Sequence, residues 1–149
     1  MNDSELRLWI YRHLVDACRA PSAIEIAGHF GVTLDEAEHR LHRLETATEA
    51  IVLIPGTNQI WMAEPFSAVP TPFVVRAGVR QWWGNCIWDG LAILALLDLD
   101  GTLSTACPFS GDPLIVTEPE IGLVTTFTET LREPLVVVSV SVTAPPSGM

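Results

Sequence analysis

The sequence predicts an α+β fold in which a helical lobe with a β-hairpin precedes a small mixed or antiparallel sheet that carries one central helix. Helical periodicity runs through the first third of the chain, β-branched residues are enriched in the last third, and three prolines fall within residues 64–72 between them. With 149 residues, 48% of them apolar, the chain can build the core of one ordinary domain or of two very small ones.

The first lobe, residues 1–63, begins with two expected helices. The first ends at Ala20-Pro21-Ser22. Ser22 is expected to cap the second helix, residues 23–30, because Glu25 stands at capping-box spacing, and Gly31 ends it. The side chains at helical spacing along the first helix are Leu6, Trp9, Ile10, His13, Leu14 and Ala17.

A third helix and a hairpin complete this lobe. Thr33 is the expected cap, with Glu36 at the matching spacing, and residues 50–54 and 59–62 are predicted strands around the turn at residues 55–58. Three helices and a β-hairpin in this order are typical of a winged helix. The apolar stripe of the third helix is expected to be Leu34, Ala37, Leu41 and Leu44.

The second part of the chain changes character. Residues 64–72 are predicted to be an extended connector, because proline and the residue before it both disfavour helix. Residues 73–143 are predicted to form the α+β core, with a helix from Cys86 to Leu97 capped by Asn85. The expected strands are residues 73–76, 79–83, 102–106, 114–117, 123–128 and 135–142, and residues 144–149 are expected to fray.

Composition excludes several classes of protein. The eight basic residues are all arginine and face eighteen acidic ones, and the net charge of −10 disfavours a nucleic-acid partner. No apolar run reaches the roughly 18 residues of a membrane span, and no signal peptide is evident. Three cysteines, an odd number, favour free thiols and a cytoplasmic location. Exposed strand edges would suit a homodimer.

The pair Cys86 and Asp89 carries the most chemical information. A cysteine at a helix start meets unpaired backbone N–H groups and a partial positive charge, which favour the thiolate, and Asp89 three residues on lies on the same face. A thiolate beside a carboxyl group offers a nucleophile or soft-metal ligand next to a proton donor. The alternative is that Cys86 is a small buried hydrophobe and Asp89 only favours the helix dipole.

Three segments together resemble the alkylmercury lyase (organomercurial lyase) family. They are PFSAVPTPF at residues 65–73, WGNCIWDGL at residues 83–91 and ACPFSGDP at residues 106–113. The resemblance covers residues 62–116 well and extends in kind to the helical lobe. It implies protonolysis of a carbon–mercury bond, or a related lyase reaction on a small soft or electrophilic substrate, without a cofactor.

The resemblance also implies roles for individual residues. Cys86 matches the cysteine that attacks mercury and would hold the metal transiently, and Asp89 matches the aspartate that passes a proton to the departing carbon. Cys107 matches a cysteine usually regarded as structural. The family's second catalytic cysteine lies in a later segment, and this sequence has no cysteine after Cys107. Cys107 would then be an auxiliary thiol if its loop folds over the helix start, or external thiols would serve.

Three tryptophans, Trp82, Trp83 and Trp88, are expected near Asn85 and the Cys86–Asp89 pair, where they would wall an apolar pocket or simply belong to the core. Two other functions stay open at this stage. One is a non-catalytic protein that binds a thiophilic metal or an apolar ligand through a thiol, and the other is a winged-helix regulator that senses such a ligand.

The charge of the third helix leads to a prediction about DNA. Residues 33–49 hold five acidic side chains against two arginines, so this helix should repel phosphate, and we expect no specific binding to duplex DNA. Fluorescence anisotropy at low salt, where electrostatic attraction is strongest, is the most permissive measurement. Salt-dependent binding at sub-micromolar protein would contradict this expectation and favour the regulator.

Overall fold

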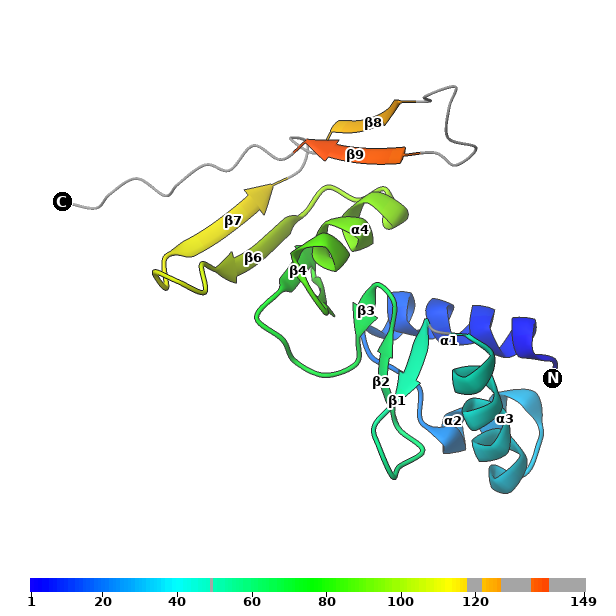
Figure 1. Cartoon of the computed structure of the whole chain (residues 1–149). Helices are drawn as coiled ribbons and strands as arrows, with labels where there is room; N and C mark the ends of the chain where they lie inside the picture. Colours follow the sequence, from blue (N-terminus) through cyan, green and yellow to red (C-terminus); the bar gives the residue numbers. More distant parts are fainter. Residues whose placement is uncertain (49, 118–121, 127–134, 140–149) are drawn as a thin grey trace.

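A computed structural model describes residues 1–48, 50–117, 122–126 and 135–139 of the chain. Its N-terminal helices are α1 (Asp3–Ala17), α2 (Ala23–Phe30) and α3 (Leu34–Ala47). Seven strands follow in one sheet: β1 (Ile51–Leu53), β2 (Ile60–Ala63), β3 (Phe66–Ser67), β4 (Val74–Ala77), β5 (Arg80–Gly84), β6 (Thr102–Ala106) and β7 (Pro113–Thr117). Helix α4 (Ile87–Leu97) connects β5 to β6, and β8 (Gly122–Thr126) pairs with β9 (Leu135–Ser139) (Figure 1).

The three N-terminal helices begin where short-range hydrogen bonds satisfy their free N–H groups. Ser22 and Glu25 form a complete capping box, and the Thr33 hydroxyl accepts from the Glu36 amide, so both predicted caps are confirmed. Asn2 and Glu5 form a second capping box at the start of α1. Leu34, expected on the buried face of α3, is instead 44% exposed, because this first helical residue lines an open groove with Ile24.

The sheet is antiparallel throughout, in the order β1-β2-β3-β5-β4-β6-β7. The short strand β3 lies within the proline-containing segment 64–72 and pairs with β2 on one side and β5 on the other. Both of its residues, Phe66 and Ser67, are buried. The hairpin that follows the helices and the strands that surround α4 are therefore parts of one hydrogen-bonded sheet.

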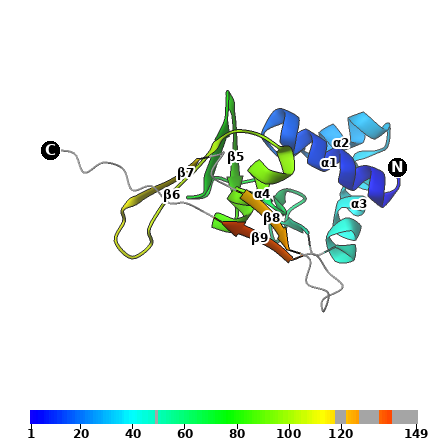
Figure 2. The same ribbon diagram turned by 90° about the horizontal axis from the view of Figure 1, so that it is seen from above.

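Helix α1 is joined to this sheet by two long-range hydrogen bonds. The Tyr11 hydroxyl donates to the carbonyl of Glu64, and the buried indole N–H of Trp82 on β5 donates to the carbonyl of Leu14 at 2.9 Å. Leu14 lies in the last turn of α1, where carbonyl groups have no partner within the helix. Figures 1 and 2 show the three helices gathered beside β1 and β2, away from the end formed by β6 and β7.

A single apolar core runs from the N-terminal helices to the strands at the other edge of the sheet, β6 and β7. Leu6, Ile10 and Ile26 are fully buried at one end, and Leu103 and Val116 are buried at the other. Helix α4 covers this face of the sheet, and its buried residues are Gly90, Leu91, Ile93 and Leu94. None of the helices that the structure describes has both the length and the apolar character needed to cross a membrane.

The indole hydrogen bond between β5 and α1 leads to a stability prediction. Trp82→Phe leaves the Leu14 carbonyl without its donor, and an unpaired buried acceptor costs about 1–3 kcal/mol. Urea unfolding should show this loss in the free energy of unfolding, with one cooperative transition. Trp61→Phe is the control, because Trp61 is 42% exposed. Equal stability of the two variants would contradict the proposed coupling.

Candidate active site

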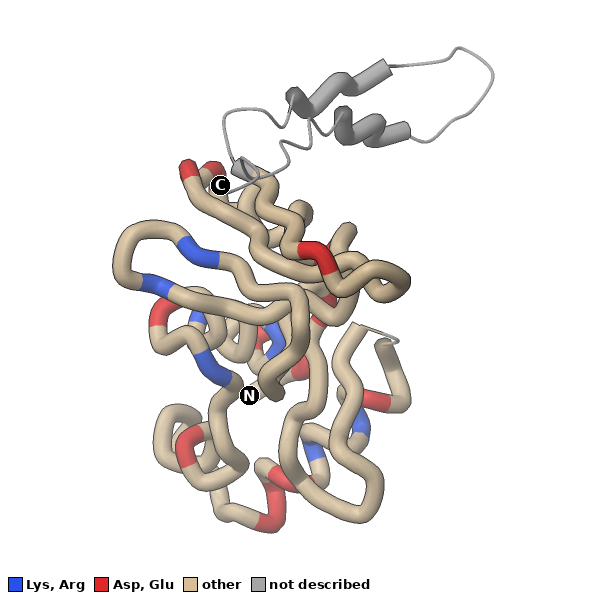
Figure 3. Tube along the Cα trace, turned by 90° about the vertical axis from the view of Figure 1, so that its left-hand side faces the viewer, with Lys and Arg blue, Asp and Glu red and all other residues tan. Residues whose placement is uncertain are grey.

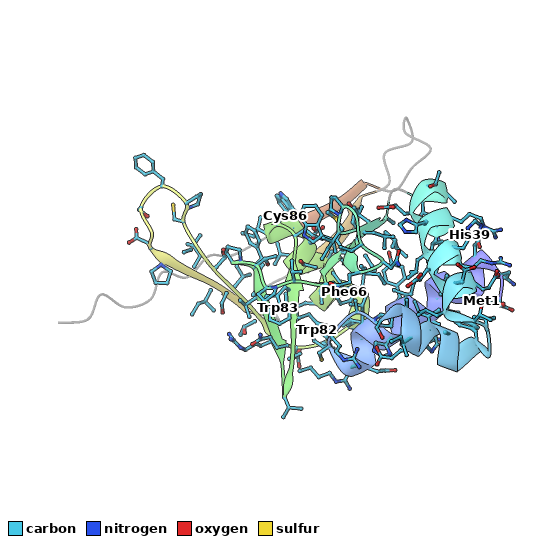
Figure 4. All side chains as sticks on the ribbon, turned by 90° about the horizontal axis from the view of Figure 1, so that it is seen from below. Met1, His39, Phe66, Trp82, Trp83 and Cys86 are labelled. Carbon is cyan, nitrogen blue, oxygen red and sulfur yellow. The ribbon has the colours of Figure 1, made fainter. Side chains whose placement is uncertain are left out.

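Cys86 and Asp89 both lie at the start of α4. Cys86 is the N-cap residue, with extended backbone at φ −146° and ψ −179°, and its carbonyl accepts the first helical hydrogen bond, from Gly90 N at 3.1 Å. Asp89 is the third residue of the helix. These are the two positions whose side chains meet in a capping box, so the thiol and the carboxyl group point to the same side of the helix start. Figure 4 shows Cys86 at this end of α4.

Asn85 does not cap α4, and the sequence-based prediction of that cap was wrong. The helix begins one residue later, because Asn85 still belongs to the turn that follows β5. Its side-chain amide donates to the carbonyl of Pro65 at 3.5 Å. The cap position therefore goes to Cys86, whose side chain makes no cap hydrogen bond and so leaves the first-turn N–H groups free.

The Cys86–Asp89 pair is partly buried and has few charged neighbours. Cys86 and Asp89 are both partly buried, and among the residues that the structure describes no basic side chain forms an ion pair with Asp89. No group of three or more His, Cys, Asp or Glu suited to a metal ion occurs in this described part of the chain.

The three tryptophans are not brought together. Trp82 and Gly84 share the face of β5 that α4 and α1 cover, and Trp82 is only 2% exposed. Trp83 lies on the opposite face, because successive strand residues alternate. Trp88 projects from the first turn of α4 and is 61% exposed. Trp88 is thus the one of the three that stands beside the Cys86–Asp89 pair on an open surface.

Cys107 lies in the loop between β6 and β7, apart from Cys86. Both residues leave the same end of the sheet, but β4 separates their strands, so two strand spacings, about 10 Å, lie between the strand ends. The loop closes on itself, since Cys107 N donates to Asp112 O and Gly111 N donates to Cys107 O, each at 2.8 Å. In Figures 1 and 4 this loop projects away from the start of α4.

The Cys107 thiol has its own polar environment. Hydrogen bonds from the Ser110 hydroxyl and from the backbone N–H groups of Ser110 and Phe109 lower the pKa of Cys107 below its usual value. This environment favours the thiolate of Cys107, which lies partly exposed in the loop between β6 and β7.

Comparison with known proteins decides the family. A family model described as alkylmercury lyase matches residues 66–148, which is more than half of the chain. The chain belongs to the alkylmercury lyase family. The matched range includes Cys86, Asp89 and Cys107 and all strands from β3 onward.

A solved structure shows the same fold. The mercury-bound form of MerB2 superposes with a TM-score of 0.60 at 20% identity, covering 77% of this chain and 54% of that chain. The present chain therefore spans about half the length of the MerB2 chain. No curated protein matches the sequence. The α+β architecture predicted from the sequence is confirmed by this likeness and by the observed helices and strands.

The helix-start position of Cys86 predicts the order in which the thiols react. We expect Cys86 to be alkylated fastest at neutral pH, because it is the N-cap residue of α4, where a cysteine faces unpaired backbone N–H groups. Iodoacetamide labelling followed by peptide mass spectrometry gives the three rates in one experiment. Cys107 is the internal comparison, and Cys18, packed beside the core, should react slowest. Faster labelling of Cys107 than of Cys86 would contradict the assignment.

Proposed function

We propose that this chain cleaves the carbon–mercury bond of small organomercurials by protonolysis, with Cys86 and Asp89 as its catalytic residues. The observation that carries the proposal is the placement of a thiol and a carboxyl group on one side of the first turn of α4, in a chain of the alkylmercury lyase family. The partial burial of both groups gives the substrate a site that is reachable from solvent.

The first step is attack on mercury. The Cys86 thiol passes its proton to the Asp89 carboxylate, and the sulfur lone pair forms a bond to mercury while the anionic ligand of the organomercurial leaves. A soft metal prefers the sulfur ligand, so this exchange is favourable. The helix-start N–H groups stabilise the negative charge on sulfur until the new bond forms.

The second step breaks the carbon–mercury bond. Protonated Asp89 gives its proton to the carbon, the electron pair of the carbon–mercury bond becomes the new carbon–hydrogen bond, and the hydrocarbon leaves. Asp89 returns to the carboxylate, and mercury(II) remains on Cys86. Placement of the acid three residues after the nucleophile, in the first turn of the same helix, supports this role.

Release of mercury then needs another soft ligand. Among the described residues Cys86 is the one thiol at the start of α4, and Cys107 lies beyond β4. A thiol from solution is the better second ligand, because it can approach Cys86 directly and carry mercury away by ligand exchange.

The single thiol at this site also favours a second candidate function. A protein that captures a thiophilic metal through Cys86, without cleaving a carbon–metal bond, needs the thiol and not the acid. The two functions therefore differ in what they demand of Asp89.

The regulator receives less support from the structure. Arg40 and Arg43 on α3 are engaged by Asp3, and Arg40 also pairs with Glu36, so their charge is compensated within the lobe. Figure 3 shows basic positions interspersed with acidic ones over the described chain. A phosphate-binding surface needs the opposite arrangement, with uncompensated basic groups on one face.

Substitution of Asp89 distinguishes catalysis from capture. Asp89→Asn keeps shape and hydrogen bonding but removes the acid, so hydrocarbon release from an organomercurial with excess thiol should fall by about a hundred- to ten-thousandfold. Mercury(II) binding to Cys86 should survive. Asp98→Asn, at the other end of α4, is the matched control and should leave turnover unchanged, because asparagine tolerates the left-handed backbone found there.

Two results decide between the functions, and a third tests the thiol that both require. Unchanged turnover in Asp89→Asn removes the proton-transfer role. Wild-type protein that binds mercury through Cys86 without releasing hydrocarbon is a capture protein. Cys86→Ser should abolish turnover and should also abolish mercury retention, which tests the thiol shared by both proposals.

A further inference from the structure

A threonine thirteen residues earlier in the sequence forms a hydrogen bond to the end of β5, where the turn into α4 begins. The Thr71 hydroxyl donates to the carbonyl of Gly84 at 2.6 Å and accepts from the amide of Phe73 at 3.2 Å. The Gly84 amide in turn donates to the carbonyl of Phe73 at 3.0 Å. These three bonds lock the end of β5 to the start of β4, two residues before Cys86.

The first turn of α4 also lies very close to the sheet at two glycines, Gly84 and Gly90. A Cβ atom on Gly84 would lie 2.6 Å from the backbone nitrogen of Gly90 and 3.0 Å from the carbonyl oxygen of Cys86. A Cβ atom on Gly90 would lie 2.5 Å from Cδ1 of Leu103, a fully buried residue of β6. At Gly84 the nearest atoms belong to the backbone, so a larger residue there pushes the helix start away from the sheet. At Gly90 a larger residue requires either the helix start or the buried Leu103 side chain to shift.

We infer that Thr71, Gly84 and Gly90 are positioning residues that set where the Cys86 thiol and the Asp89 carboxyl group stand. None of the three needs to contact substrate. The Thr71 hydroxyl is occupied by hydrogen bonds to the backbone of Gly84 and Phe73. The two glycines act because they allow α4 to lie close to the strands. Their effect reaches the site through the Cys86 backbone, whose carbonyl both bonds to Gly90 and borders Gly84.

The size of the effect follows from the geometry that reaction requires. A displacement of about 1 Å between reacting groups can lower a rate by about a hundredfold without any change in the groups themselves. Substrate binding through one sulfur is less demanding than the alignment of sulfur, mercury, carbon and acid. Loss of the positioning contacts should therefore lower kcat and leave KM nearly unchanged.

Two pairs of variants test the inference. Thr71→Val removes the hydroxyl and Thr71→Ser keeps it, so only the valine variant should be impaired. Gly90→Ala introduces the contact with Leu103, whereas Gly28→Ala on α2 is the matched control, because nothing lies within 4 Å of that position. Circular dichroism and thermal melting establish that each variant is folded.

Two readouts are needed, because the activity measurement rests on the proposed function. With methylmercury and excess thiol, Thr71→Val and Gly90→Ala should lose roughly ten- to a hundredfold in kcat with KM within about twofold of the wild type. With iodoacetamide, the labelling rate of Cys86 relative to Cys107 in the same molecule should fall by about tenfold. The reason is that the Cys86 thiol is displaced from the N–H groups of the first turn of α4.

The outcomes separate the two proposals. If the wild type shows no turnover, the proposed function fails, and the labelling ratio alone decides the positioning role. Folded Thr71→Val with a wild-type labelling ratio and wild-type kcat would overturn the inference. If Gly90→Ala does not fold, the Thr71→Val and Thr71→Ser pair still decides, and equal impairment of both threonine variants would also overturn it.

Discussion

Backbone contact between α4 and the sheet is the constraint on which the arrangement of this molecule depends. Gly84 and Gly90 bring the end of β5 and the first turn of the helix together, and Gly90 rests on the side chain of Leu103. Because glycine has no side chain, α4 lies closer to the strands at this point than a larger residue would allow. The consequence is that Cys86 takes the cap position and Asp89 follows it on the same side.

The same sheet connects this site to the N-terminal helices. β3 has only two residues, yet it bridges the β1–β2 hairpin to β5, and the indole of Trp82 bonds to the end of α1 from the strand that leads into the site. The strand that carries Trp82 ends at Gly84, the residue that Thr71 holds. The helical lobe and the candidate active site therefore share one core and one set of strands, and a loss of packing in one is expected to be felt in the other.

Local sequence signals predicted the parts of the fold that local interactions decide. The caps at Ser22 and Thr33 depend on residues three positions apart, and both were predicted correctly. The cap of α4 was misplaced at Asn85, because Asn is the stronger capping residue by type, whereas tertiary contacts start the helix at Ile87. The pairing of β3 with β5, and the bond from Thr71 to Gly84, join residues too far apart for periodicity to reveal. Alternation along β5 would have separated Trp82 from Trp83, but the covered face is known only once α4 is placed. Predicted elements within residues 118–121, 127–134 and 140–149, including the tail at 144–149, lie outside the described residues.

The two thiols at this end of the sheet have different surroundings and therefore different chemistry. Cys86 stands at a helix start, three residues before a carboxyl group, and the proposed mechanism rests on these two features. Cys107 is held by hydrogen bonds from Ser110 and Phe109 in a loop that faces solvent, with a lowered pKa and a like-charged neighbour in Asp112. The lowered pKa of Cys107 favours binding of a thiophilic metal. The proposed catalysis requires a carboxyl group three residues along a helix from the thiol, and among the three described cysteines this arrangement is found at Cys86.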